Sequence, residues 1–312
     1  MKQMEKLPDE LAEKLQKVAD DQNVVLMSFI APDITVRKSP SSFDYASIKV
    51  SDLYRIEAEI DKIKSAGGSL RKLHLIIQTP GGELTTSTKI ADYLQTVFGE
   101  NIDAYVPYEA ASGGTLLCLA AKHIVMCSTS NLTPIDPQII YRFGRISATS
   151  YEQAINEFKR DYGNLRPEEI PSPYQQMASQ FDPVTSKEMS KVVWDTLNVA
   201  YKFLLKSQNP KTDEEKQKMT ALVFSLGKTD WPHSHVISLD EAKKIGLNID
   251  ENANQIELLN LYKRWVAARL NEEQENHIID VFYPKQKTNE TETQPASTIP
   301  AQTTKQEKRE KP

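Results

Sequence analysis

Apolar positions along this chain follow two spacings, one typical of amphipathic helices and one typical of buried strands. Near the N-terminus they recur every three or four residues with charged residues between them, which predicts a helix. Its apolar stripe needs a partner surface, either on its own domain or on a neighbouring subunit. Four short continuous apolar runs further along the chain predict buried strands. The helix stripe is Met4, Leu7, Leu11, Leu15 and Val18, and the strands are 24–30, 73–78, 102–106 and 123–126.

Helical spacing returns between these strands. Ser51 is expected to cap one helix, and a second helix is expected over residues 84–98. Strands that alternate with helices predict a parallel sheet covered by helices, and therefore an α/β fold. In such sheets ligands bind beyond the carboxyl ends of the strands. The glycine pair at 81–82 and the Ser-Gly pair at 112–113 both fall at that edge.

The second half of the chain is predicted to be mainly helical. A polar, proline-rich stretch over 164–183 is interpreted as a long loop or lid-like insertion. From about residue 285 almost nothing is apolar, which predicts a disordered tail. The expected helices are 151–162, 189–204, one from about 213, 239–245 and 251–276. The expected organisation is an N-terminal amphipathic helix (1–22), a main domain (23–250), a C-terminal helical segment (251–284) and the tail (285–312).

The segment Ala111-Ser112-Gly113-Gly114 joins an apolar run that ends at Pro107 to a second apolar run. A strand that enters a helix through a Ser-Gly-Gly turn exposes the serine, and the glycines allow a sharp turn and close approach of a substrate backbone. Free N–H groups at the start of the helix stabilise an alkoxide or a tetrahedral oxyanion. Serine is also a favoured N-cap residue, so the segment 110–115 alone leaves open both a nucleophile and a simple helix cap.

The charge, the cysteine content and the lack of long apolar stretches limit the classes of protein to which this chain can belong. A net charge of −5 gives no general case for nucleic-acid binding. Cys118 and Cys127 form neither a disulfide framework nor a metal signature, and are interpreted as reduced core residues. Because the chain has no signal-like apolar core and no apolar stretch long enough to cross a bilayer, we expect a cytoplasmic protein without an integral membrane segment. No phosphate-binding loop is present, so no ATPase activity is expected.

Several segments together carry a resemblance that none of them carries alone. They are 75–82 (LIIQTPGG), 111–115 (ASGGT), 124–126 (IVM) and 134–138 (PIDPQ). They resemble the Clp-protease/crotonase superfamily and, more closely, the SDH-type (serine dehydrogenase proteinase) prokaryotic serine peptidase family, which is related to signal peptide peptidase A. The strong match covers residues 70–140, and a weaker match reaches His233, Ile237, 241–243 (EAK) and 246–247 (GL).

The resemblance implies a spiral of ββα units with added helices at the C-terminal end. It also implies peptide-bond hydrolysis without a metal or a cofactor, a peptide or protein substrate, and assembly into homo-oligomers. Ser112 falls on the serine nucleophile of the family, and Gly81, Gly82 and Gly113 fall on the backbone groups that hold the substrate and the oxyanion. The N-terminal and C-terminal helices are the expected sources of subunit contacts.

The sequence departs from the family pattern in several places. Gln78 replaces a histidine that is common before the glycine pair, and Thr133 replaces a glycine. The segment 141–164 does not follow the expected pattern. The membrane segment that many members carry near the N-terminus is also not evident here.

The base that activates the serine is not obvious from the sequence. Clp-type proteases place a histidine about 25 residues after the serine, and Asp136 occupies that neighbourhood here. Lys159 is the first candidate, because it borders an apolar helix face, where loss of hydration favours a neutral amine. The alternative interpretation of Lys159 is a solvated lysine on a helix surface. His233 is the second candidate, and its alternative is a loop histidine bonded to backbone. Asp136 either orients the base or bonds within its own turn, and His123 is assigned to the core.

Three functions are weighed. The first is a serine peptidase that acts on extended or unfolded polypeptides. The second is a catalytically silent member that binds peptides or scaffolds an assembly, which the absence of an evident base favours. The third is a crotonase-like acyl-CoA enzyme. The Ser-Gly-Gly-Thr turn argues against this third function, because it suits a nucleophile better. The first is the hypothesis adopted.

Overall fold

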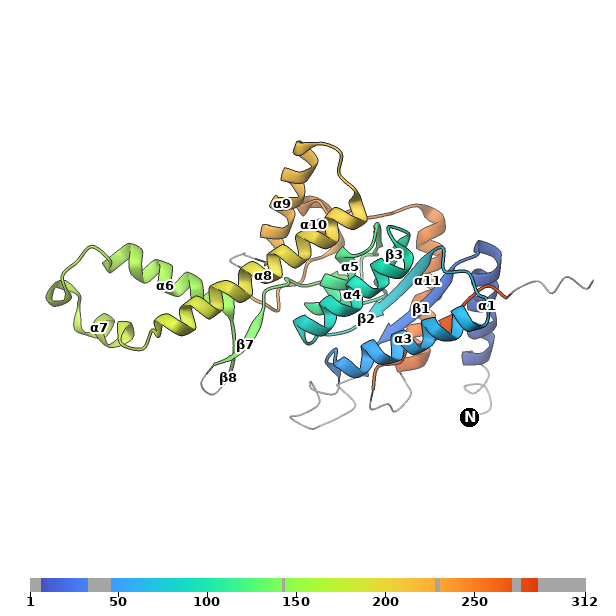
Figure 1. Ribbon diagram of the computed structural model, residues 1–312, viewed down its shortest axis with the longest axis horizontal. Coiled ribbons are helices and arrows are strands. Elements are labelled where there is room, and N and C mark those ends of the chain that lie inside the picture. The colour runs from blue at the N-terminus through green and yellow to red at the C-terminus, as the bar shows by residue number, and fades with distance from the viewer. Residues whose placement is uncertain (1–6, 33–45, 142–143, 228–230, 271–275, 286–312) are drawn as a thin grey trace, which may run out of the picture.

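The four apolar runs that the sequence pattern predicted as strands form the central sheet of the computed structural model (Figure 1). The structure describes residues 7–32, 46–141, 144–227, 231–270 and 276–285. The sheet has the strand order β5-β3-β2-β1-β9, in which the first four strands are parallel and β9 pairs antiparallel with β1. Its strands are β1 (Val25–Ile30), β2 (Leu73–Gln78), β3 (Ile102–Tyr105), β5 (His123–Val125) and β9 (Val281–Phe282).

Strands β2 and β3 are each followed by a short extended segment and then by a helix. The short strands β4 (Glu109–Ala110) and β6 (Asn131–Leu132) pair in parallel, and single bridges add Thr79 and Ile237 on either side. The helices are α3 (Val50–Ser65), α4 (Leu84–Phe98) and α5 (Gly113–Leu119). This repetition is the predicted spiral of ββα units, so the α/β fold class is confirmed.

The two faces of the sheet are covered by different helices because side chains alternate along each strand. One set of strand residues, such as Leu75 and Ala104, packs against α3, α4, α5 and the long helix α8 (Pro183–Gln208). The other set, such as Ile76 and Tyr105, packs against α1 (Leu7–Gln22) and α11 (Ala253–Leu270). The two helix layers hold the carboxyl ends of the strands at one fixed edge.

The apolar stripe of α1 finds its partner within the same chain. Leu11, Leu15 and Ala19 are buried, in one cluster with Tyr262 and Trp265 of α11. The expectation that these two helices supply subunit contacts is therefore wrong for the face that they share. Met4, at the start of the predicted stripe, lies outside the described residues.

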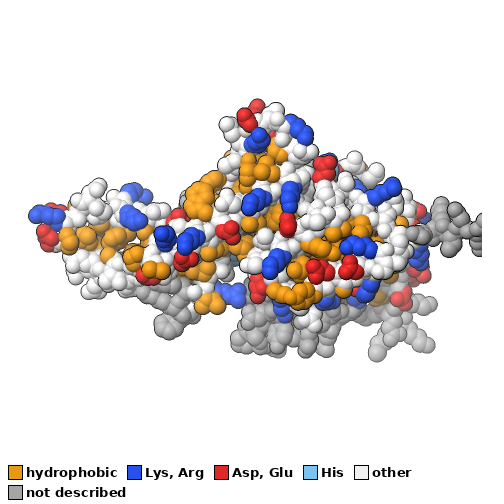
Figure 2. All heavy atoms as spheres, in the orientation of Figure 1, with side chains coloured by type: hydrophobic (Ala, Val, Ile, Leu, Met, Phe, Trp, Pro, Cys, Tyr) orange, Lys and Arg blue, Asp and Glu red, His pale blue; other side chains and the backbone are white. Residues whose placement is uncertain are grey.

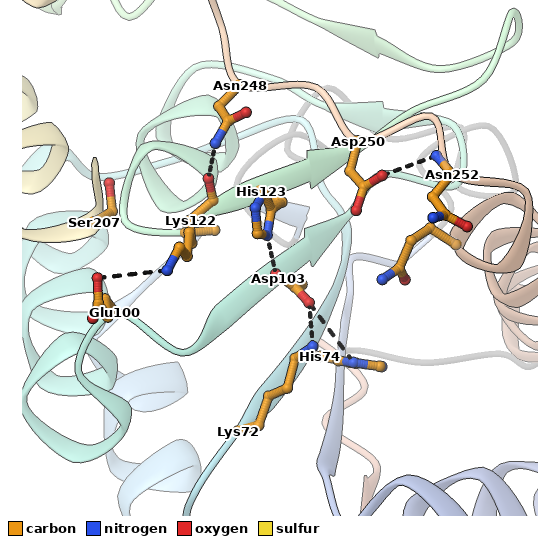
Figure 3. A network of polar contacts seen from close by, with 12 residues as sticks. Lys72, His74, Glu100, Asp103, Lys122, His123, Ser207, Asn248, Asp250 and Asn252 are labelled. Atoms are coloured by element: carbon orange, nitrogen blue, oxygen red, sulfur yellow. Dashed lines mark hydrogen bonds and ion pairs between the residues drawn. The ribbon is translucent and has the colours of Figure 1, made fainter. Parts of the chain in front are cut away.

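A row of polar side chains crosses the sheet near the amino ends of its strands, at the edge opposite the glycine and serine turns (Figure 3). Asp103 of β3 lies between His74 of β2 and His123 of β5, and its Oδ1 atom lies 2.9 Å from Nδ1 of His123. Its Oδ2 atom lies 2.7 Å from the Lys72 ammonium. His74 is 1% exposed and its Nδ1 atom lies 2.9 Å from the Tyr262 hydroxyl. The row thus ties three strands to α11.

An arm of helices extends away from the sheet (Figure 1). It consists of α6 (Ala148–Tyr162), the 3₁₀ turn η1 (Pro167–Glu169), α7 (Ser172–Ala178) and the first half of α8. The stretch 164–183 is therefore not the long loop that its prolines suggested. Asp182 caps α8 and Pro183 occupies its first position, so these residues start a helix rather than break one. Figure 2 shows apolar side chains gathered along this arm.

The remaining elements complete the architecture. The hairpin β7 (Gln138–Tyr141) and β8 (Gly144–Ser147) precedes the arm, and α9 (Asp213–Gly227) and α10 (Leu239–Ile245) follow it. Ser51 is not the cap of α3, because Lys49 is the N-cap residue and its N–H donates to Asp52. The predicted tail beyond residue 285 lies outside the described residues. Among the described helices, none is both long enough and apolar enough to cross a bilayer.

Candidate active site

Ser112 has a strained backbone conformation at the turn between β4 and α5. Its φ is 48° and its ψ is −107°. Among the described residues, only Asn23 and Asn209 are other non-glycine residues with positive φ, and asparagine tolerates this region. For serine the conformation costs free energy, of order 1–3 kcal/mol. Such strain persists where surrounding contacts enforce it, and it marks Ser112 as a candidate functional residue.

The hydroxyl of Ser112 does not cap α5. Ser112 occupies the N-cap position, but its side chain makes no capping hydrogen bond. The interpretation of this serine as a simple helix cap is therefore wrong. Ser112 instead lies on the wall of a cavity.

Two backbone N–H groups are available beside the serine. Among the described residues, the N–H groups of Gly82 and Gly113 have no acceptor, and both glycines line the same cavity as Ser112. The N–H of Gly81 is already engaged with Oγ1 of Thr79 at 3.2 Å. The available donors are therefore Gly82 and Gly113, a pair suited to an oxyanion.

The glycines allow the two turns to touch. Gly81 has φ +97°, and a Cβ there would lie 2.7 Å from the Ala111 carbonyl oxygen and 2.9 Å from Cβ of Ser112. A Cβ at Gly113 would lie 2.4 Å from Oγ of Ser87 on α4. Only residues without a side chain fit this close approach. The glycine turn that follows β2 thus packs directly on the serine turn.

The serine turn is also tied to the loop that follows β6. The Ser112 N–H donates to Oγ1 of Thr133 at 2.8 Å. The Thr115 hydroxyl lies 2.8 Å from the carbonyl oxygens of Ala110 and Thr133, and accepts the Thr133 N–H at 3.2 Å. Thr133, which departs from the family pattern, therefore contacts the nucleophile candidate directly.

The cavity at Ser112 has a volume of about 480 Å³. Ser112, Gly113 and Gly82 lie on its wall together with His233. Most of its other walls are apolar and come from five parts of the chain, with Lys49, Glu83 and Arg145 among the few charged residues. The apolar residues are Ile48, Pro80, Leu84, Leu116, Ile135, Pro137, Ile139, Ile140 and Val192.

Asp136 and His233 form a pair at this cavity. Nδ1 of His233 lies 3.7 Å from Oδ2 of Asp136, and the Asp136 side chain is 5% exposed. Burial raises the pKa of the Asp136 carboxyl, but contacts with His233, Thr149 and Ser147 outweigh burial and hold that pKa below its usual value. Asp136 is therefore ionised at neutral pH. A buried carboxylate beside one ring nitrogen favours the proton on that nitrogen and leaves the other to act as a base.

The described residues that follow His233 tie its loop to β6 and α10. Ile237 exchanges two backbone hydrogen bonds with Leu132, at 2.9 and 3.0 Å. His235 stacks on Trp231 with ring centroids 4.4 Å apart, and its Nε2 atom lies 3.0 Å from Glu241. The weak sequence match around these residues thus corresponds to a loop held against β6.

The other candidates from the sequence lie elsewhere. Lys159 is exposed on the arm helix α6 and is not among the described residues that line the cavity. His123 lies in the polar row at the opposite edge of the sheet. Sequence reasoning did not select Thr133 as a partner of Ser112, nor Ile48 and Ile139 as cavity walls. The only sequence signal for Thr133 was its departure from the family pattern, and the sequence offered no signal for Ile48 or Ile139.

Within the described residues, no group of three or more His, Cys, Asp and Glu side chains is arranged to hold a metal ion. The groups gathered at the site are a hydroxyl, an imidazole, a carboxylate and two backbone N–H donors.

Comparisons with known proteins identify the family to which this chain belongs. Residues 39–166 match the family model described as ClpP-like SDH-type serine proteinase. An uncharacterized protein of Methanocaldococcus jannaschii is 30% identical over 240 residues, which are 76% of this chain and 75% of that protein. A second uncharacterized protein of the same organism is 28% identical over 199 residues, 63% of this chain and 59% of that protein. The chain belongs to the ClpP-like SDH-type serine proteinase family, and the resemblance noted in the sequence is confirmed.

Among solved structures, two of the similar chains are mutants of the 1510-N membrane-bound stomatin-specific protease. A serine-to-alanine mutant has a TM-score of 0.42 and 14% identity, with 68% of this chain and 79% of that chain covered. A lysine-to-alanine mutant in complex with a substrate peptide has a TM-score of 0.41 and 13% identity, with 67% and 74% covered.

Proposed function

We propose that this chain is a serine peptidase that hydrolyses peptide bonds in extended or unfolded polypeptides, with Ser112 as nucleophile, His233 as general base and Asp136 as the group that orients the base. The observation that carries the proposal is the strained Ser112 backbone in one cavity with His233, whose Nδ1 atom faces the buried Asp136 carboxylate. Family membership supports the same chemistry.

In the proposed mechanism His233 accepts the Ser112 hydroxyl proton as Oγ attacks the carbonyl carbon of the scissile peptide bond. The negative charge that develops on the carbonyl oxygen accepts hydrogen bonds from the N–H groups of Gly82 and Gly113. His233 then gives its proton to the leaving amine, and an acyl group remains on Ser112. Water, deprotonated by the same imidazole, releases the acid and restores the serine.

The cavity supports a polypeptide substrate. Two of its walls are extended segments, the 47–49 segment beside Gly82 and the strand β7. The space between extended segments suits a peptide in extended conformation, and the apolar lining suits apolar side chains. Folded proteins do not offer such a segment, so we infer that unfolded or flexible regions are the substrates.

Lys159 stays the alternative base in this proposal, because it lies beside the apolar face of its helix. Its exposed position on α6 gives it no contact with the cavity in the single chain. His233 is therefore the base that we propose.

We also infer that the protein self-associates and acts in the cytoplasm. The arm carries large apolar side chains that are exposed in the single chain: Leu165, Tyr174, Met177 and Val184. Exposed apolar groups gathered on one projecting element favour a contact with another protein surface. Sedimentation velocity at micromolar concentration tests this part of the proposal, and a clean monomer contradicts it.

Hydrolysis of an unfolded protein tests the proposed activity. The wild-type chain and the Ser112→Ala variant are incubated with reduced, carboxymethylated casein, and new peptide termini are identified by mass spectrometry. The proposal predicts new termini with the wild type and none with Ser112→Ala. Binding of casein without cleavage by a correctly folded wild type would instead support the catalytically silent peptide-binding protein.

A further inference from the structure

The amide of Ser112 is held by a side chain rather than by the backbone. Its N–H donates to Oγ1 of Thr133 at 2.8 Å and has no other acceptor among the described residues. Thr133 is itself 6% exposed, so water has little access to replace this acceptor. A partly buried N–H that loses its acceptor is costly, which makes the contact a strong restraint on the turn.

The restraint acts on a residue that needs one. The φ of 48° at Ser112 is unfavourable for serine, and a peptide free to rotate would relax toward negative φ. Rotation about the N–Cα bond of Ser112 would change the orientation of its amide relative to Thr133 and the direction of its hydroxyl. The hydrogen bond to Thr133 therefore opposes the relaxation.

The same threonine connects the nucleophile to the rest of the site. The Thr115 hydroxyl donates to the Thr133 carbonyl and accepts the Thr133 N–H. Together with the Ser112 N–H bond to Oγ1 of Thr133, three hydrogen bonds join the serine turn to the 133–136 segment. Asp136 lies three residues after Thr133 on that segment. Through this connection the position of the serine depends on the position of the carboxylate that faces His233.

We propose that Thr133 is a positioning residue: its hydroxyl holds Ser112 in the left-handed conformation and fixes the serine turn relative to the segment that carries Asp136. The proposal rests on the proposed function, because it assigns the hydroxyl a role in the reactivity of Ser112. Thr133 is not among the described residues that line the cavity, so in this proposal it acts only through Ser112.

Three substitutions separate the hydroxyl from the methyl group. Thr133→Ser keeps the hydroxyl and loses the methyl group, Thr133→Ala loses both, and Thr133→Val keeps the shape and loses the hydroxyl. The Ser and Ala variants thus differ by a single oxygen atom. Each variant is compared with the wild type for thermal unfolding, for kcat and KM on a casein-derived peptide, and for the rate of reaction with a fluorophosphonate probe.

We expect turnover to fall in the variants that lack the hydroxyl oxygen and to be kept in the variant that retains it. Thr133→Ala and Thr133→Val should lower kcat and the labelling rate by about tenfold to a hundredfold, because small misplacements of a nucleophile have effects of this size. KM should stay within about twofold of the wild-type value, because the cavity wall is unchanged. Thr133→Ser should keep most of the activity.

Two results would overturn the positioning role while the peptidase proposal stands. One is full activity of Thr133→Ala in a folded protein. The other is an equal loss in Thr133→Ser and Thr133→Ala, which would assign the effect to packing of the methyl group. If Thr133→Val does not fold, the Ser and Ala pair still decides. A folded wild type that neither reacts with the probe nor cleaves peptide would instead refute the peptidase proposal, and the positioning role with it.

Discussion

Oδ2 of Asp136 lies 3.7 Å from Nδ1 of His233, at the cavity that also contains Ser112. The distance is longer than a hydrogen bond, and Nδ1 of His233 is buried without a hydrogen-bond partner among the described residues. A small shift of the His233 loop on substrate binding would close it, as catalytic hydrogen bonds often tighten only in the complex. The geometry favours His233 over Lys159 as the base.

The first prediction concerns the identity of the base. His233→Ala should abolish peptide hydrolysis and probe labelling, because the serine hydroxyl then has no proton acceptor. Asp136→Asn should lower kcat by about 10²- to 10⁴-fold, because the amide no longer favours the correct tautomer of His233. Single-turnover kinetics with a fluorogenic peptide measure both effects.

Lys159→Ala is the matched control for these variants. Its side chain is exposed on α6, so activity and thermal stability should stay close to wild type. Loss of labelling in Lys159→Ala together with normal labelling in His233→Ala would reverse the assignment.

The second prediction concerns the contact between the two turns. Gly81 and Gly246 share a φ of +97°, but a Cβ at Gly246 meets nothing within 4 Å, whereas one at Gly81 meets the backbone of the serine turn. Alanine at either position should cost about 1–2 kcal/mol of stability from backbone strain. Only Gly81→Ala should also lower kcat/KM, by about a hundredfold, because it displaces Ser112. Equal activity of the two variants would show that the contact does not position the serine.

The third prediction is a loss of stability in mild acid. Burial, together with the charge of Lys72, lowers the pKa of His74 to about 4, while Asp103 acts in the opposite direction. Between about pH 6.5 and 4 the unfolded chain therefore binds a proton that the folded chain excludes. The free energy of unfolding contributed by neutral His74 is complete above pH 6.5 and decreases as pH falls, by up to about 3 kcal/mol.

Asp103 adds to the acid sensitivity at lower pH. Burial would raise its pKa, but contacts with Lys72 and His123 outweigh burial and lower it, so its stabilising charge is lost as pH falls below its usual value of about 3.8. Urea unfolding at several pH values measures the slope. The slope between pH 6.5 and 4 should be smaller for His74→Gln than for wild type, and an identical slope would contradict the assignment to His74.

The fourth prediction distinguishes the two cysteines. Burial raises the pKa of Cys118, whereas the Cys127 thiol has its pKa lowered to about 7. Partial burial opposes this shift, but the Ser130 and Thr129 hydroxyls and the Lys263 ammonium, 3.5 Å from Sγ, outweigh it. Iodoacetamide at about pH 7 should therefore alkylate Cys127 at least about tenfold faster than Cys118 in the folded protein.

Lys263→Met is the informative variant for this thiol. It removes the positive charge and keeps a side chain of similar length, so alkylation of Cys127 should slow at neutral pH. Peptide mapping by mass spectrometry measures both cysteines in one sample. An unchanged rate at Cys127 would show that the Lys263 charge does not contribute, and would assign the lowered pKa to the Ser130 and Thr129 hydroxyls.

The strands and helices of the ββα spiral could be predicted from the sequence because each has a strong local pattern. The run over 73–78 and the helix over 84–98 match β2 and α4 residue for residue. In the arm, the helices over 151–162 and 189–204 were predicted, but 164–183 was interpreted as a loop because of its prolines, although Pro183 begins α8. Strand β9 has only two residues, and its pairing with β1 depends on contacts distant in the sequence.

Some residues of the site could likewise be predicted from local sequence, whereas others depend on contacts between distant parts of the chain. Ser112 and the glycines are set by short motifs, and these could be selected from the sequence. The choice between His233 and Lys159 depends on which loop the fold brings to β6, and no local pattern contains that information. The role of the Thr133 hydroxyl likewise depends on a contact between two turns.

Labelling with a fluorophosphonate probe, followed by mass spectrometry of the adduct, tests the central claim most directly. The account predicts a single adduct on Ser112 in the wild type, no adduct in Ser112→Ala, and no adduct in His233→Ala. An adduct on another residue, or a folded wild-type protein in its native assembly that does not react, would contradict the claim that Ser112 is an activated nucleophile.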